Sequence, residues 1–341
     1  MKRAVVIGAG GQIGRPAVHA LVRDGWEVTA ASRGGTRDPA WPDDVRTVRL
    51  DREDDTALAA LIGDGCDVLV DMVAYGARHA RQLTALADRV GSAVVVSSVS
   101  VYEDDRGRGF DTQDQPDGFP EYPVPLTEKQ PTVRPGESTY STRKAALEHE
   151  LLAAEGQLPV TVLRPGAIHG PYCRTPRELY FVKRNLDGRR RRVLSFGGHS
   201  RFHPAGVHNI AELIRLAASR PGSRVLNAVD PDAPTVAEIA AAIDAVMGIE
   251  AESVLVDGPP PAPTVGDTPW SVPVPVVCDM SAAERELGYR PVARYAETLP
   301  EAVTWIEGQL AGRDWREAFP KMFQAYGDLF DYAAENAWLA K

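Results

Sequence analysis

The sequence has few cysteines and no long apolar run. Its three cysteines, Cys66, Cys173 and Cys278, lie far apart and form no Cys-x-x-Cys pair. This spacing excludes a zinc framework and a disulfide scaffold, and it fits a reduced, cytoplasmic protein. No stretch approaches the roughly 20 apolar residues that span a bilayer, and the first apolar run breaks at glycines too early for a signal peptide. We therefore expect no membrane contact.

Positive charge is also in deficit, with 38 Lys and Arg against 47 Asp and Glu and a net charge of -9. A nucleic-acid partner is therefore not expected, and the basic run at residues 188–192 is interpreted as a solvated face. His199, His203 and His208 lie in a segment interrupted by glycine and proline. Because no helix can present them together, no metal site is predicted.

The N-terminal segment predicts a strand, a glycine-rich turn and a helix. Residues 3–7 form a β-branched run, "GAGGQIG" follows, and residues 15–25 show helical apolar spacing. In such a unit, glycines allow a tight turn and close approach of the backbone to a pyrophosphate, which rests at the helix N-terminus. The residues predicted to bind a dinucleotide in this turn are Gly8, Gly10, Gly11, Gln12, Ile13 and Gly14.

The second predicted strand, "EVTAAS", ends at Ser32 and Arg33, where an acidic residue would hold the ribose hydroxyls of NAD. An arginine here can pair with a 2′-phosphate, so NADP is the expected cofactor and NAD the alternative. Further strands are predicted at "VRLDRED", "CDVLVDMVA" and "SAVVVSSVSVY", and the alternation of strands and helices predicts an α/β fold with a doubly wound parallel sheet. These strands add Asp51, Arg52, Val73 and Ala74 to the predicted cofactor site.

A Tyr-x-x-x-Lys pair opens the predicted helix "YSTRKAALEHE". Together with "GAGGQIG", "VVVSSVSVY", "LRPGAIHGP", "PTVAEIAAAI" and "CDMSAAERELGYRP", in this order, it makes residues 1–310 resemble the extended short-chain dehydrogenase/reductase superfamily, that is, the NAD-dependent epimerase/dehydratase family. The resemblance implies catalytic roles for Ser98, Tyr140 and Lys144. It places Pro165, Gly166 and Ile168 beside the nicotinamide. The residues expected to face the substrate are Tyr75, Ser100, His169 and Arg201.

The resemblance also implies a division of the chain and leaves two segments outside the family pattern. Residues 103–125 form an acidic, turn-rich insert with few apolar anchors, predicted to be an active-site lid or a surface loop. Aromatic residues from Trp315 to Phe330 recur every three or four positions and predict a helix docked on the protein's own surface. A dimer contact or a cover over a pocket is the alternative for this stripe, so a homodimer stays open. The implied parts are a Rossmann domain at 1–165 with a returning strand near 223–229, a smaller, mainly substrate-binding lobe at 166–311, and a helical extension at 312–341.

The resemblance implies that Tyr140 is the acid in reduction and the base in oxidation, while hydride moves to or from the nicotinamide. A free tyrosine has a pKa of about 10, and the positive charges of Lys144 and of an oxidised nicotinamide ring would lower it. Ser98 would hydrogen-bond the substrate oxygen. Ser98 is followed by Val99 and Ser100, whereas 4,6-dehydratases carry an acidic pair there, so dehydration is disfavoured.

We therefore predict an NADP-dependent oxidoreductase that interconverts a ketone and an alcohol, or an imine and an amine, on a polar, medium-sized metabolite. The alternative is an NAD-dependent nucleotide-sugar epimerase. Against that alternative, Arg201 is out of register by a residue or two with the arginine that binds the diphosphate in nucleotide-sugar members. A non-catalytic cofactor-sensing or RNA-associated protein is a third, less favoured class.

Overall fold

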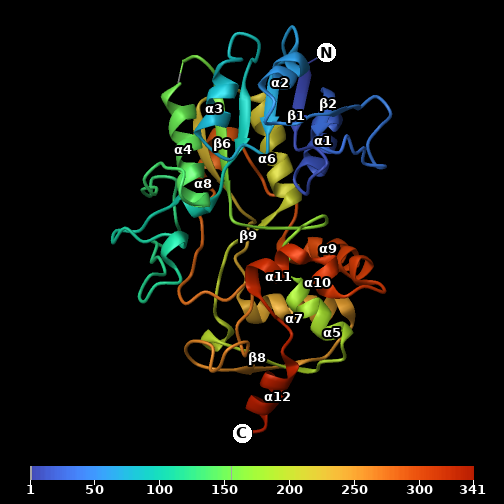
Figure 1. The fold of residues 1–341 in the computed structure, drawn as a ribbon, viewed down its shortest axis with the longest axis vertical. Coiled ribbons are helices and arrows are strands. Elements are labelled where there is room, and N and C mark those ends of the chain that lie inside the picture. The colour runs from blue at the N-terminus through green and yellow to red at the C-terminus, as the bar shows by residue number, and fades with distance from the viewer. Residues whose placement is uncertain (1, 155) are drawn as a thin grey trace. The chain divides into compact units, whose positions relative to one another are not determined.

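The computed structural model describes residues 2–154 and 156–341 and divides the chain into two units (Figure 1). Two segments predicted for the smaller lobe, residues 207–222 and 278–292, belong instead to unit 1. The predicted C-terminal extension is part of unit 2. Unit 1 consists of Met1–Gly166, Val207–Val229 and Cys278–Val292, and unit 2 consists of Ala167–Gly206, Asp230–Val277 and Ala293–Lys341.

Unit 1 is built on one seven-stranded parallel sheet. Its strands are β1 (Arg3–Ile7), β2 (Glu27–Ser32), β3 (Arg46–Arg49), β4 (Val68–Asp71), β5 (Ala93–Val96), β6 (Val160–Pro165) and β10 (Arg224–Ala228). Their order, β3-β2-β1-β4-β5-β6-β10, reverses between β1 and β4. This reversal is the switch point of a doubly wound sheet, at which ligands bind beyond the carboxyl ends of the strands. The predicted fold class is confirmed.

Helices cover both faces of this sheet. They are α1 (Gly14–Arg23), α2 (Asp55–Ile62), α3 (Ala77–Thr84), α4 (Tyr140–Ala153), α6 (Val207–Ser219) and α8 (Ser281–Leu287). The helices α3 and α4 pack together on one side, and α1 and α6 on the other (Figure 1). All residues of β4 and β5 are buried, as continuous apolar runs require when both faces are covered. Since α6 packs on α1, and α8 on α6 and β10, the two late segments complete unit 1.

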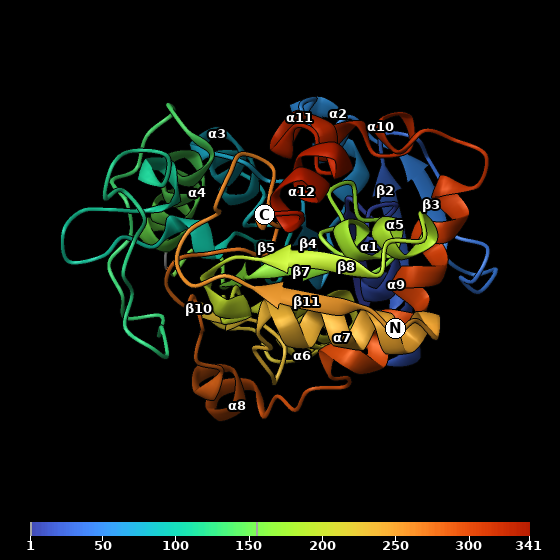
Figure 2. The ribbon, with the colours of Figure 1, turned by 90° about the horizontal axis from the view of Figure 1, so that it is seen from below.

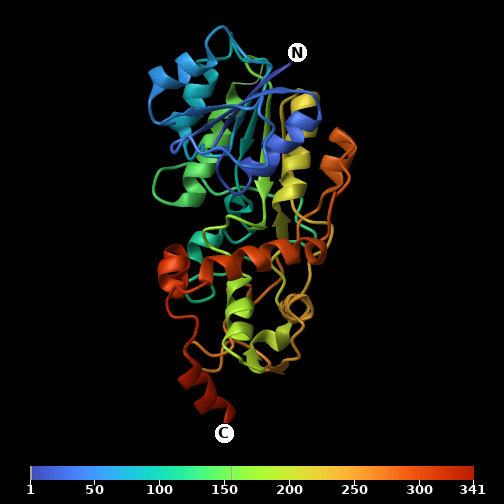
Figure 3. The ribbon, with the colours of Figure 1, turned by 90° about the vertical axis from the view of Figure 1, so that its right-hand side faces the viewer.

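Unit 2 contains two small parallel sheets, β7 (Ala167–His169) with β9 (Pro204–Gly206), and β8 (Arg191–Leu194) with β11 (Glu252–Leu255). Figure 2 shows β8 and β11 side by side. The helix α9 packs against α5 and α7, and it runs across α5 in Figure 3. The helices of unit 2 are α5 (Leu179–Leu186), α7 (Val236–Met247), α9 (Tyr295–Leu310), α10 (Trp315–Ala318), α11 (Pro320–Tyr326) and α12 (Tyr332–Leu339).

The C-terminal residues do not form the single aromatic stripe that the spacing predicts. The helix α10 ends before Phe319, whose backbone is non-helical (φ -130°, ψ 62°), and Pro320 begins a new helix. Trp315 and Phe319 are each 2% exposed, but Phe323 is 43% exposed. The prediction of one continuous helix is therefore wrong at Pro320, although the rings of Phe323 and Phe330 still pack edge-on against Trp315, with centroids 5.7 and 4.9 Å away.

The basic run at residues 188–192 is not a uniformly solvated face. Arg192 is buried and donates a hydrogen bond to Asp244 at 3.0 Å. Arg189 donates to Glu335 of α12 at 3.0 Å. The run therefore helps to hold α12 within unit 2. None of the helices in residues 2–154 and 156–341 has the length and apolarity needed to cross a bilayer.

Candidate active site

The turn between β1 and α1 packs too closely for side chains at its glycines. Gly8 has φ +87°, and a Cβ on Gly14 would lie 2.3 Å from the Gly8 carbonyl oxygen. The helix α1 begins with no side-chain cap and no acidic residue in its first turn, so its N–H groups can receive an anion. In the described part of the chain, the buried Nε2 of Gln12 has no hydrogen-bond partner. These features fit the pyrophosphate of a dinucleotide.

Two predicted cofactor residues end β2. A Cβ on Gly10 would lie 3.4 Å from the Ser32 Oγ, so Ser32 borders the glycine turn. Arg33 is exposed, and no carboxylate within residues 2–154 and 156–341 pairs with it. The nearby Arg15 is paired with Asp38 at 2.6 Å. Arg33 therefore differs from Arg15 in having its guanidinium available to a phosphate.

The two cofactor-binding residues predicted after β3 differ in their exposure to solvent. Asp51 is exposed, as a contact with adenine requires. Arg52 is 5% exposed, and its guanidinium lies 2.7 Å from the carboxylate of Asp71, the last residue of β4. Arg52 thus forms an internal ion pair in place of the predicted cofactor contact. Sequence reasoning missed Asp71, although an acidic residue that ends an apolar strand is a signal for a buried partner.

Residues after β4 contact both the glycine turn and α4. A Cβ on Gly8 would lie 3.1 Å from Val73 Cγ1, so Val73 packs against the turn. Lys144 is 2% exposed, and its Nζ donates to the carbonyl oxygens of Ala74 at 2.6 Å and Val96 at 2.8 Å. Lys144 therefore ties α4 to the carboxyl ends of β4 and β5.

Ser98, Tyr140 and Lys144 come together at this edge of the sheet. Ser98 follows β5, and its Oγ accepts a hydrogen bond from Ser100 N at 3.1 Å. Tyr140 is the first residue of α4, with its ring 43% exposed and the Lys144 Nζ 5.8 Å from the ring centroid. The Ser98 side chain is close enough to act on the pKa of the Tyr140 phenol, which it lowers. The structure therefore groups the three residues predicted to be catalytic.

The local electrostatics differ from the sequence-based expectation for Tyr140. Loss of solvation raises the pKa of Tyr140 to about 12, the neighbouring Tyr75 adds to the rise, and the Ser98 side chain opposes it. Burial lowers the pKa of Lys144 to about 8, against the pull of the Asp71 carboxylate. In the chain without a cofactor the pKa of Tyr140 therefore lies above its ordinary value, and the phenol is protonated at neutral pH.

Two hydroxyl residues and an aromatic ring border this group. Tyr75 is 47% exposed; its ring centroid lies 6.3 Å from that of Tyr140, and the Lys144 Nζ lies 4.8 Å from it. The Oγ atoms of Ser97 and Ser100 are buried and have no partner in the described chain. Sequence reasoning named Tyr75 and Ser100 but not Ser97, whose neighbour Ser98 carries the family motif.

The remaining predicted residues fall at or beyond the end of unit 1. Pro165 and Gly166 end the first segment of unit 1, whereas Ile168, His169 and Arg201 belong to unit 2. Arg201 is exposed, but the His169 ring is 1% exposed and its Nε2 lies 2.6 Å from Asp230 Oδ2. His169 thus has a buried carboxylate partner where sequence reasoning expects a substrate.

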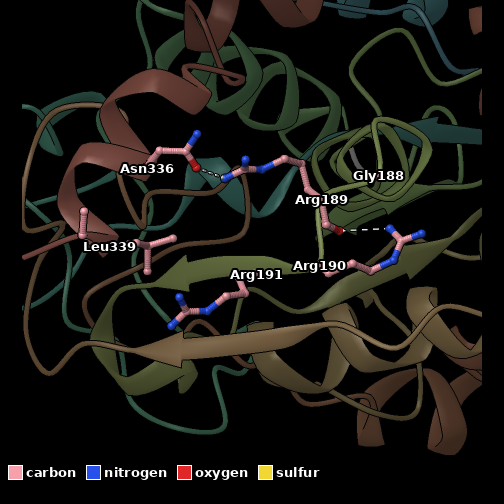
Figure 4. Close-up of a pocket in the computed structure, with 7 residues that line it drawn as sticks. Gly188, Arg189, Arg190, Arg191, Asn336 and Leu339 are labelled. Carbon is pink, nitrogen blue, oxygen red and sulfur yellow. Dashed lines mark hydrogen bonds between the residues drawn. The ribbon is translucent and has the colours of Figure 1, made fainter.

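A cavity of about 410 Å³ in unit 2 contains none of the predicted catalytic or cofactor-binding residues (Figure 4). Its arginines are already engaged, since Arg189 donates to Asn336 at 2.7 Å and Arg191 to Glu252 at 2.8 Å. The cavity therefore does not mark the active site. Its lining consists of Gly188, Arg189, Arg190, Arg191, Asn336, Leu339 and Ala340.

Comparisons with known proteins indicate the family and the fold of the chain. The model of the NAD-dependent epimerase/dehydratase family matches residues 4–222. No curated protein sequence matches the chain.

Solved structures with the same fold include dTDP-glucose 4,6-dehydratase from Bacillus anthracis in complex with NAD (18% identity, TM-score 0.68, 94% of this chain and 100% of that one). UDP-N-acetylglucosamine 4-epimerase from Bacillus cereus is similar at 18% identity and TM-score 0.67, over 90% and 100% of the two chains. The enzyme WbmH from Bordetella bronchiseptica, in complex with NAD+, is similar at 18% identity and TM-score 0.67, over 96% and 100%. At these identities the likeness shows the fold alone.

Proposed function

The chain belongs to the NAD-dependent epimerase/dehydratase family, and we propose that it oxidises and reduces a carbinol carbon of a polar metabolite. Its membership confirms the predicted resemblance and the prediction of an NAD(P)-dependent enzyme. The observation that supports this most is the grouping of Ser98, Tyr140 and Lys144 in unit 1, which also carries the glycine turn.

Bound NAD(P) would supply and accept the hydride. The first turn of α1 and the free Nε2 of Gln12 would hold the pyrophosphate. Ser98 would donate a hydrogen bond to the substrate oxygen and steady its developing charge. The phenol of Tyr140, protonated because its pKa is about 12, would give its proton to that oxygen during reduction and take it back during oxidation.

We propose an epimerase as the leading form of this chemistry, with the same carbon oxidised and then reduced on its other face. The family match and the nucleotide-sugar enzymes among the solved structures support this alternative of the sequence analysis over its main reading. An NADP-linked reductase is the second candidate, supported by the exposed Arg33, which has no carboxylate partner in the described chain.

Mass spectrometry of the small molecules released from purified protein tests the two forms. An epimerase should release tightly bound NAD and should keep deuterium from the reacting carbon of a labelled nucleotide sugar in its product. A reductase should release NADP or nothing, and should consume one NADPH for each ketone reduced. Failure to bind either dinucleotide, in purified protein or on titration, would contradict both forms.

A further inference from the structure

One carboxylate of the insert at residues 103–125 forms hydrogen bonds with the N-terminal end of α4. Asp111 lies in a short 3-10 helix (Phe110–Thr112), and its Oδ2 accepts a hydrogen bond from Thr139 Oγ1 at 2.5 Å. Its Oδ1 accepts one from Ser141 Oγ at 2.9 Å. These two hydroxyl groups belong to the residues immediately before and after Tyr140.

The N-terminus of α4 does not need Asp111 as a cap. Thr139 already accepts a hydrogen bond from Thr142 N at 3.1 Å, and Thr142 Oγ1 accepts one from Thr139 N at 3.0 Å. This reciprocal pair satisfies the backbone N–H groups of Thr139 and Thr142. The two bonds to Asp111 are additional, and they fix the side chains on both sides of Tyr140.

Aromatic packing holds Asp111 in place. The ring of Phe110 packs edge-on against Phe119, with centroids 5.9 Å apart, and lies 6.3 Å from that of Tyr122. Tyr122 is 7% exposed, and its hydroxyl donates to the Tyr102 carbonyl at 2.9 Å. The insert therefore has apolar anchors that its composition does not reveal.

A buried carboxylate closes the insert into a loop. Asp104 is 5% exposed and accepts hydrogen bonds from the backbone N–H groups of Arg106, Arg108 and Glu121, each at 2.9 Å. Burial acts to raise the pKa of Asp104, but these donors outweigh it and lower the pKa to about 2. The loop is thus held by an ionised group at neutral pH, and Asp111 extends from a fixed base.

We propose that Asp111 is a positioning residue, whose two-point grip on Thr139 and Ser141 fixes the orientation of the Tyr140 phenol toward Ser98. A carboxylate is suited to this place, because the N-terminus of α4 favours negative charge. The proposal rests on the proposed function only in naming Tyr140 as the acid and base. The grip itself is a property of the chain and can be tested without a substrate.

The test follows the Tyr140 Cζ resonance in cofactor-free protein labelled with ¹³Cζ-tyrosine, assigned by its loss in Tyr140→Phe. Asp111→Ala should shift or broaden this resonance. Ser141→Ala removes only one bond and should change it in the same direction, with little added in the double variant. Asp114→Asn, a charge change in the same insert at an exposed residue without a partner in the described chain, should leave it unchanged. If Asp111→Ala does not fold, Ser141→Ala and Asp111→Asn give the same readout.

Turnover supplies a second readout once a substrate is found. Asp111→Ala should lower kcat about tenfold, because a small displacement of a reacting group is costly, while KM and the cofactor Kd stay within about twofold. Asp111→Asn keeps one acceptor oxygen and should recover part of the rate. An unchanged Tyr140 resonance in both Asp111→Ala and Ser141→Ala, or an equal change in Asp114→Asn, would overturn the proposal even if the enzyme proves to be an epimerase.

Discussion

A single side chain at the end of β2 bears on the choice of cofactor. If Arg33 pairs with a 2′-phosphate, Arg33→Ala should weaken NADP binding by about 1.5 kcal/mol, the lower end for a hydrogen bond to a charged group, since Arg33 is exposed. NAD binding should change little. Titration of both cofactors measures the difference, with Arg46→Ala, an exposed arginine at the amino end of β3, as the control. Equal losses for NADP and NAD would reject the pairing.

The resemblance to the family indicates the candidate catalytic residues but not the residues that support them. Ser98, Tyr140 and Lys144 were identifiable because each lies in a motif of fixed order. Asp111 acts on residues about 30 positions later in the chain, and no local pattern marks it. For Arg52 the motif suggested too much. Its position beside a strand end predicted a ligand contact, whereas its guanidinium forms an ion pair with Asp71, the last residue of β4. Contacts between distant segments decide such roles.

At the scale of elements, the β7–β9 pair carries a buried acid–base contact in unit 2. Asp230 Oδ2 lies 2.6 Å from His169 Nε2, and Asp230 Oδ1 accepts from Gly206 N at 2.7 Å. Burial acts to lower the pKa of His169, but the Asp230 carboxylate, with Glu178, raises it above the ordinary value. The protonated ring is therefore more stable in the folded chain than in the unfolded one.

This contact predicts a defined pH dependence of stability. A raised folded pKa contributes stability that is full below about pH 6.5, the unfolded value, and is lost as pH rises through the folded pKa. The difference in unfolding free energy between the natural chain and His169→Gln should therefore be about 1 to 3 kcal/mol at pH 6 and shrink in alkaline buffer. Urea unfolding across this range measures it. The lowered pKa of His203 acts in the opposite sense and cancels in the difference. A difference that grows with pH would refute the assignment.

Hydrophobic periodicity predicted strands and helices well where all of a segment packs against the same surroundings. The apolar runs at β4 and β5 and the helix from Tyr140 to Ala153 lie where the pattern placed them. It failed for the C-terminal aromatic residues, because a helical stripe assumes one continuous register and Pro320 starts a second helix. Composition also underestimated the insert, where a few aromatic side chains pack together around Phe110 and the buried Asp104 closes the loop.

At the scale of the whole molecule, the order of motifs predicted the doubly wound sheet, but not the path of the chain between the two units. The helix α6 packs on α1, nearly two hundred residues earlier in the chain, and α8 packs on α6. No spacing rule reports contacts at such separations. Substrate choice lies in loops that spacing rules do not interpret, which is why the sequence predicts the type of chemistry more closely than the metabolite.

The central claim is that Tyr140 handles the proton of a hydride transfer. The direct measurement is stopped-flow absorbance of the nicotinamide band when cofactor-loaded protein is mixed with a panel of nucleotide sugars and small ketones, for the natural chain and for Tyr140→Phe. The variant loses one oxygen and should bind the cofactor with unchanged affinity. We predict a transient or lasting change in the band with the natural chain, and a rate at least about 10² lower in Tyr140→Phe. Equal rates in the two proteins would contradict the account.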